Sequence, residues 1–195
     1  MKGENKMKKF LTLSILMIAV AVLLAGCTNP FNKNDNSTNN NTAANNVSHE
    51  PTLLDGYTTY SGKSYSINYK SDWTAQDNPT VSYPTDTFLS PSGLSQVSVT
   101  LESLPIVYTL DQYTNASLQN LQSNYTVSDV SKDKVTVNGY DAYRISYDMT
   151  ANGNTATIMQ TVLVNNKTGY VITYAGSDAD GETVYHNMED SIVMK

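Results

Sequence analysis

The chain of 195 residues is acidic, with 12 basic and 18 acidic residues and a formal net charge of −6 at pH 7. Residues 51–195 contain seven basic and fifteen acidic residues, so this part alone carries a net charge of −8. Such a charge disfavours binding to nucleic acid, which requires basic patches, and direct binding to anionic lipid headgroups. The chain has one cysteine, so hydrophobic packing rather than disulfide bonds must hold its folded part together.

Residues 1–26 have the parts of a secretory signal peptide. The first nine residues contain four lysines and one acidic residue, Glu4. The next sixteen residues, Phe10 to Ala25, are uncharged and mostly apolar. This run is too short for a membrane-spanning helix, which needs roughly 20 residues, and suits the apolar core of a signal peptide. We therefore expect residues 1–26 to direct export of the chain.

The apolar run ends in Leu24-Ala25-Gly26-Cys27, which contains the only cysteine. These residues resemble the lipobox of prokaryotic lipoproteins, where a signal peptidase cleaves before a lipidated cysteine. The resemblance implies a diacylglyceryl thioether on Cys27 and a mature chain anchored at the outer face of the cell membrane. Each buried acyl methylene group contributes about 0.8 kcal/mol to such anchoring. A structural cysteine in an ordinary signal peptide or membrane anchor is the alternative.

Residues 27–50 comprise this cysteine and an Asn-rich tether. Nine of the 23 residues from 28 to 50 are Asn, and sizeable apolar side chains are almost absent. A stretch of this composition buries too little surface to offset the entropy lost on ordering. We expect a disordered spacer that holds the folded part away from the membrane.

Residues 51–195 have a globular composition and are long enough for one domain with its own core. Polar and apolar residues alternate in three segments, 65–69, 97–101 and 143–149, which predicts half-buried strands. Two further segments, 157–164 and 170–174, are richer in apolar and β-branched residues and predict interior strands.

Turn signals join the later strands. Asn138-Gly139 separates residues 134–137 from 140–149, and both turn residues tolerate positive φ. Asn152-Gly153-Asn154 and residues 165–169 join the strands that follow. Four strands connected by short turns predict an antiparallel meander.

Two segments have helical patterns. Thr109 and Gln112 have the spacing of a capping box, and apolar residues then follow one face, which predicts a helix at about 109–123. Val184, Met188 and Ile192 recur every four residues, which predicts a second helix at about 180–193. Strands and helices in this order indicate an α+β fold.

Five segments carry a resemblance to a known family: Gly62–Trp73, Phe88–Pro91, Thr109–Tyr113, Asn138–Tyr143 and Tyr170–Tyr174. They resemble segments of PsbP-like domains, although Lys70 stands where the family has a proline. The resemblance implies one PsbP-like domain over residues 51–195, with a central antiparallel β-sheet flanked by helices in an α/β/α sandwich. The family includes extrinsic subunits of photosystem II and prokaryotic envelope lipoproteins.

No catalytic residue set is evident in the sequence. The chain has no Gly-x-Ser-x-Gly nucleophile elbow, and its two histidines are His49 in the tether and His186 in the second predicted helix. We therefore expect no enzyme, with a hydrolase that depends on His186 as the weaker alternative. We also expect His186 to lie on the helix surface.

One acidic cluster has the spacing of a calcium-binding loop. Asp178, Asp180, Glu182 and Glu189 occupy its positions one, three, five and twelve, but the glycine, Gly181, falls at position four instead of six. The cluster is either a divalent-cation site, with Ca²⁺ as the candidate, or acidic capping of a helix start.

These patterns lead to a functional hypothesis. We expect a membrane-anchored extracytoplasmic lipoprotein whose non-enzymatic domain binds a protein or another envelope component as an accessory factor. The alternative is a divalent-cation-binding module of the calcium type. No other cofactor and no nucleic acid partner are expected.

Overall fold

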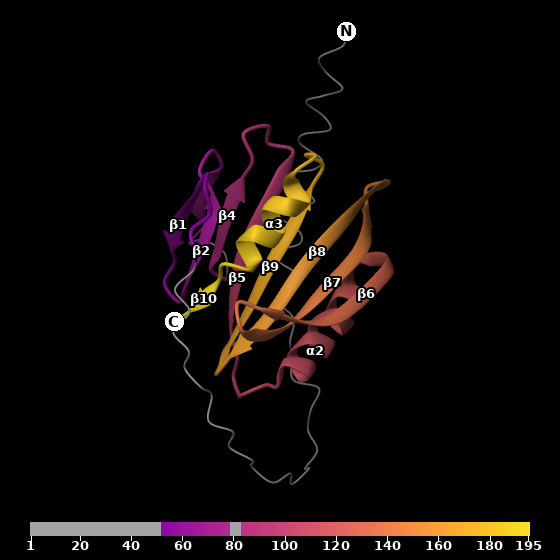
Figure 1. The fold of residues 1–195 in the computed structure, drawn as a ribbon. Helices are drawn as coiled ribbons and strands as arrows, with labels where there is room; N and C mark the ends of the chain where they lie inside the picture. The colour runs from indigo at the N-terminus through magenta and orange to yellow at the C-terminus, as the bar shows by residue number, and fades with distance from the viewer. Residues whose placement is uncertain (1–51, 79–82) are drawn as a thin grey trace.

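The structure is a computed structural model, and it describes residues 52–78 and 83–195. The described residues form a large and a small antiparallel sheet with two helices (Figure 1). The predicted lipidation site, Cys27, and the predicted tether lie outside the described residues.

The large sheet has seven strands in the order β3-β4-β5-β9-β8-β7-β6. Every neighbouring pair is antiparallel, and β9 joins the meander of β6 to β9 to the earlier strands by pairing with β5. The predicted meander is therefore confirmed, whereas its pairing with β5 was not predicted. The strands are β3 (Thr74–Asn78), β4 (Thr85–Leu89), β5 (Ser95–Ser103), β6 (Thr126–Val137), β7 (Tyr140–Ala151), β8 (Asn154–Asn165) and β9 (Thr168–Gly176).

The hairpin turns have the backbone that their residues favour. Asn138 and Gly139 have φ values of 44° and 80°, and Asn152 and Gly153 have values of 52° and 76°. Positive φ at both central residues is the signature of a type I′ turn, whose twist matches that of the flanking strands. These two turns fix the register of β6, β7 and β8.

The small sheet is formed by β1 (Tyr57–Ser61), β2 (Tyr65–Lys70) and β10 (Val193–Met194). It packs against one face of the large sheet together with the second helix, α3 (Gly181–Glu189). The core of this layer includes Ile67 from β2, Val99 from β5 and Met188 from α3, all fully buried.

The other helix, α2 (Leu110–Asn124), covers the opposite face at the end of the sheet formed by β6, β7 and β8 (Figure 1). Tyr113 and Leu121 of α2 pack there against Ile145 and Ile158. Helices thus lie on both faces, as expected. The fold is β-rich rather than an even sandwich, because the small sheet forms much of one outer layer.

Helix α2 begins where the sequence predicts. The hydroxyl of Thr109 accepts a hydrogen bond from the Gln112 backbone at 3.2 Å, and the Gln112 side chain accepts one from the Thr109 backbone at 3.0 Å. This reciprocal capping box satisfies two backbone donors that a helix start leaves free.

Helix α3 ends earlier than predicted, at Glu189 instead of 193. The backbone N–H groups of Ser191 and Ile192 donate to the carbonyl groups three residues earlier, of Met188 and Glu189. The chain then enters β10. Val193 pairs there with Ser66 of β2. Pairing with the small sheet therefore overrides the four-residue apolar period at the end of the helix.

Candidate functional site

The structure does not bring together the four carboxylates with calcium-loop spacing. Asp178 accepts hydrogen bonds from the Ser92 hydroxyl at 2.8 and 2.9 Å, and Asp180 binds the Lys70 ammonium at 2.7 Å. Glu182 is exposed, and Glu189 is fully buried at the other end of α3. No three His, Cys, Asp or Glu side chains of the described chain are grouped to hold a metal ion.

The physical reason is the position of the helix. Because α3 begins at Gly181, Glu182 and Glu189 are separated by two helical turns, whereas a calcium loop must curl around the ion. Asp180 stands at the N-cap without a side-chain capping bond, and its carboxylate turns to Lys70 instead. Its charge still lies near the helix start, where it suits the helix dipole.

A buried polar cluster ties α3 to the large sheet. Glu189 is the centre, and its side chain is completely buried. Arg144 of β7 donates to one carboxylate oxygen, and Thr161 of β8 donates to the other. The Thr161 hydroxyl also lies 2.6 Å from the Tyr185 hydroxyl. We call Arg144, Thr161, Tyr185, His186 and Glu189 the α3 cluster.

His186 lies at the solvent edge of the α3 cluster. Its Nδ1 is 2.6 Å from a Glu189 oxygen, its Nε2 is 3.7 Å from Glu182, and its side chain is one third exposed. The expectation of a plain surface residue was therefore too simple, because the imidazole bridges an exposed and a buried carboxylate. Within the part of the chain that the structure describes, no hydroxyl group is hydrogen-bonded to His186.

The electrostatics of the α3 cluster follow from its burial. Burial, followed by the charge of Glu189, raises the pKa of Tyr185 well above its usual value. Burial and then Glu189 also raise the pKa of Asp190, next in the chain. Burial acts to lower the pKa of the Arg144 guanidinium, but the hydrogen bond to Glu189 and the charge of that carboxylate, with smaller contributions from Tyr185 and Asp190, together raise it. Arg144 therefore stays charged and the Tyr185 hydroxyl stays neutral at neutral pH.

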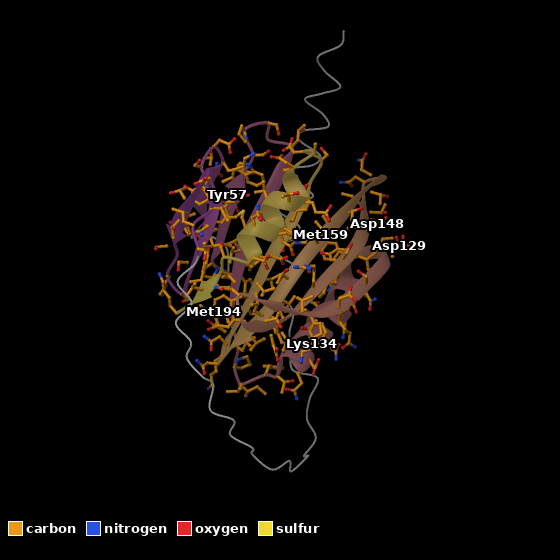
Figure 2. All side chains as sticks on the ribbon, viewed as in Figure 1. Tyr57, Asp129, Lys134, Asp148, Met159 and Met194 are labelled. Carbon is orange, nitrogen blue, oxygen red and sulfur yellow. The ribbon has the colours of Figure 1, made fainter. Side chains whose placement is uncertain are left out.

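Next to the α3 cluster, the sheet face over β6, β7 and β8 is open. Arg144, Ser146 and Asp148 point to the same face as α3, because side chains alternate along a strand. Their neighbours across the sheet are Asp133 and Ser131 on β6 and Thr161, Met159 and Thr157 on β8. Most of these side chains are exposed or half-buried. Figure 2 shows Met159 beside α3 and Asp148 further along this face.

We call this surface the open face and define it by Ser131, Asp133, Ser146, Asp148, Thr157 and Met159. Its charged groups are Asp133 and Asp148, and Glu182 and Asp190 of the neighbouring α3 region are exposed as well. Arg144 is the only cation pointing to it from β6, β7 or β8 in the described structure, and Glu189 neutralises that charge. The open face is therefore an acidic surface.

A second polar group lies between the two sheets. The Tyr65 hydroxyl donates to Asp86 at 2.5 Å, and Tyr60 contacts Phe88 edge-on at 5.3 Å. Burial and then the Asp86 carboxylate raise the pKa of Tyr60 to about 12 and that of Tyr65 further still. Both phenols thus remain protonated, and they fasten β1 and β2 to β4.

Sequence reasoning missed the α3 cluster. Its signal is that Glu189 follows Tyr185 by four residues and Met188 by one, so a carboxylate lies within the apolar stripe of the helix. A second signal is Arg144, which lies in a strand of a sheet that was expected to be flanked by helices. Buried charges are almost always paired, so together these residues point to one ion pair.

A family model described as PsbP-like protein matches residues 11–195. The chain belongs to the PsbP-like family. Its fold agrees with this assignment, because the solution structure of cyanobacterial PsbP (CyanoP) from Synechocystis sp. PCC 6803 is similar at a TM-score of 0.56. The two chains are 14% identical over 73% of this chain and 94% of CyanoP, so the likeness concerns the fold alone.

Two further solved structures are more distant from this PsbP-like chain. A crystal structure from Bacteroides thetaiotaomicron has a TM-score of 0.49 at 13% identity, covering 72% of this chain and 48% of that protein. LpqN of Mycobacterium tuberculosis, described as involved in cell envelope biogenesis, has a TM-score of 0.39 at 11% identity, covering 74% and 82%. No curated protein matches the chain. The described residues include no helix of a length and hydropathy that would cross a membrane.

Proposed function

We propose that this protein is a lipid-anchored, extracytoplasmic PsbP-like domain that binds a protein partner of the cell envelope as a non-enzymatic accessory factor. The observation that carries the binding role is the open face, an exposed acidic surface beside a helix that the α3 cluster ties to the sheet. A rigid surface suits binding, because little freedom is lost when a partner docks.

The charge of the open face indicates the kind of partner. Asp133 and Asp148 have no cation within 4 Å in the described structure. Asp148 accepts a hydrogen bond from the Thr157 hydroxyl at 2.7 Å, which leaves its negative charge unneutralised. Complementary charge raises association rates and excludes partners of like charge. We therefore infer a partner with a basic surface, bound in a salt-dependent way.

Site-specific photo-cross-linking in intact membranes tests this proposal. A photoreactive residue at position 159 on the open face is expected to give one dominant cross-linked species. The matched control is position 119, exposed on α2 at the opposite side of the sheet. The species is expected to weaken in high salt and to disappear with Asp133→Lys and Asp148→Lys together. Equal cross-linking at both positions would contradict a binding role for the open face.

The anchor has its own test. The sequence Leu24-Ala25-Gly26-Cys27 supports lipidation, which adds a thioether-linked diacylglyceryl group to Cys27. Mass spectrometry of the mature chain is expected to find a lipidated N-terminal Cys27. Cys27→Ser is expected to abolish this modification and the processing before it. A mature chain with an unmodified Cys27 would refute the anchor.

A further inference from the structure

One end of the large sheet combines lysines with exposed apolar residues. The end lies low in Figure 1, where β5 leads into α2, and it is formed by residues 62–64, 104–109, 138–139, 165–167 and Lys195. Hydrogen bonds join these segments: Leu104 to Lys167 at 2.8 Å and Lys195 to Ser64 at 2.9 Å along the backbone. We call this surface the lysine end.

An apolar loop protrudes from the lysine end. Val107 is 67% exposed and Ile106 is 57% exposed, and Val107 is the most exposed of the large hydrophobic residues that the structure describes. The loop is fixed at its base, because Leu104 is buried and its backbone is bonded to Lys167. The two aliphatic side chains are thus presented to solvent on an anchored loop.

The lysines around this loop carry unneutralised charge. Lys63, Lys167 and Lys195 are exposed, and none has a carboxylate within 4 Å in the described structure. Lys134 also lies toward this end, where Asp141 approaches it at 3.5 Å (Figure 2). Two further carboxylates lie toward this end: Asp111 accepts a hydrogen bond from Tyr143, and Glu102 is buried and accepts one from Tyr113.

The opposite end of the domain is acidic. Asp72, Asp178, Asp180 and Glu182 gather around the start of α3, and Lys70 is the cation that contacts two of them. Asp148 lies toward the same end on β7, close to the turn at 152–153. The net charge of −8 is therefore unevenly distributed, and a negatively charged plane attracts one end and repels the other.

We propose that the lysine end docks on the anionic lipid surface of the membrane, with Ile106 and Val107 entering the headgroup region. This inference rests on the proposed anchor at Cys27. The 23 residues from 28 to 50, taken as the spacer that their composition predicts, would span roughly 25–30 Å, so the proposed anchor would keep the domain within reach of the surface. A net charge of −8 disfavours anionic lipid where the charge is spread evenly, but in this domain the lysine end and the acidic end carry opposite charge.

The docked orientation has a consequence for the partner. With the lysine end on the lipid, the acidic end and the start of α3 point away from the membrane. Asp148 of the open face then lies on the outward side, where a basic partner approaches. Lipid and partner contact different parts of the domain and do not compete.

A single fluorescent label tests the docking. Val107→Cys in the lipidated full chain provides one free thiol, because Cys27 carries the lipid in the proposed mature form. The labelled protein is reconstituted into phosphatidylcholine vesicles with or without phosphatidylglycerol. A blue shift and quenching by lipid-borne spin labels are expected only with phosphatidylglycerol. Lys63→Glu with Lys167→Glu is expected to lower docking by at least fivefold for each lysine lost.

The matched control is Thr183→Cys, an exposed residue of α3 at the acidic end. Its label is expected to report water in both kinds of vesicle. A water-exposed label at position 107 in anionic vesicles would overturn the docking, as would equal responses at 107 and 183. A shift in phosphatidylcholine that grows with protein density would assign the surface to a second copy of this chain and also overturn it.

Mass spectrometry of the same sample separates the two proposals. An unmodified Cys27 contradicts the anchor whatever the label reports, and the label on a Cys27→Ser chain added to the vesicles then still decides the docking. A water-exposed label on a chain with lipidated Cys27 contradicts the docking alone.

Discussion

Helices α2 and α3 pack on opposite faces of one sheet but are held in place by different means. Helix α2 runs for 15 residues, and its own sequence supplies a complete capping box at Thr109 and Gln112. Helix α3 has nine residues and no side-chain cap, and its position depends on Glu189 binding to β7 and β8. Local sequence thus determines one helix, and long-range contacts determine the other.

The largest expected effect comes from replacing Glu189, whose ion pair and hydrogen bond hold α3 against the large sheet. Glu189→Gln keeps the shape of the side chain but leaves the Arg144 guanidinium without its buried counter-charge. Losing one partner of a buried ion pair costs about 3–5 kcal/mol, but the Arg144 side chain is 35% exposed, and water reduces the loss. We expect a loss of about 2–3 kcal/mol in the free energy of unfolding and a fall of roughly 6–12 °C in Tm. Chemical denaturation measures it.

Glu182→Gln is the matched control, because Glu182 is exposed on the same helix and its effect is expected to stay below about 0.5 kcal/mol. Hydrogen exchange is expected to rise in α3 and not in α2 when Glu189 is replaced. An equal loss of stability in both variants would mean that the α3 cluster does not fasten the helix.

This contrast explains which parts of the fold the sequence predicts. Turns such as Asn138-Gly139 and the capping box of Thr109 depend on residues a few positions apart, and they were predicted correctly. The pairing of β5 with β9 joins residues about 70 positions apart, such as Val99 and Ile172, and no local pattern reports it. The early end of α3 was missed because pairing between Val193 and Ser66 determines it.

The next largest effect concerns the N-terminal cap of α2. Thr109→Ala removes the hydroxyl that caps the helix and is expected to cost about 1 kcal/mol in the free energy of unfolding. Thr109→Ser keeps the hydroxyl and serves as the control. Asp180→Ala, at the equivalent position of α3, removes no capping bond and only an exposed ion pair, so its cost is expected to be smaller. Equal losses at Thr109 and Asp180 would contradict the difference between the helices.

Lowering the pH is expected to change the free energy of unfolding in opposite directions through Glu102, beneath α2, and Asp178, near α3. Burial beneath α2 raises the pKa of Glu102, although the bond from Tyr113 partly offsets this. Because the folded state binds this proton more tightly, Glu102 makes stability fall as pH rises from its ordinary pKa to the raised one. Glu102→Gln is therefore expected to stabilise the protein modestly at pH 7, with a gain that disappears below about pH 4.

Asp178, near α3, provides the opposite case. Burial opposes its charge, but hydrogen bonds from Ser90 and Ser92 outweigh this and lower the pKa of its carboxyl group. The stabilisation by the ionised Asp178 carboxylate is fully present above the ordinary pKa of the group. It is lost as the pH falls through the lowered pKa of the folded state. Denaturation curves across pH are expected to show a weaker acid-induced loss of stability in Asp178→Asn. For Glu102, a stabilisation by Glu102→Gln that grows as the pH falls would contradict a raised pKa of that carboxyl group.

The smallest expected effect concerns the acidic start of α3. Asp178 is engaged by Ser92 and Asp180 by Lys70, so a calcium ion would have to displace both contacts and draw Glu189 out of its buried ion pair. An ion present at 100 times its Kd would stabilise the fold by about 2.7 kcal/mol. We expect Ca²⁺ added after a chelator to leave the Tm unchanged. A rise that Asp178→Asn removes would show that these carboxylates rearrange, and α3 would then be held by a ligand as well as by the sheet.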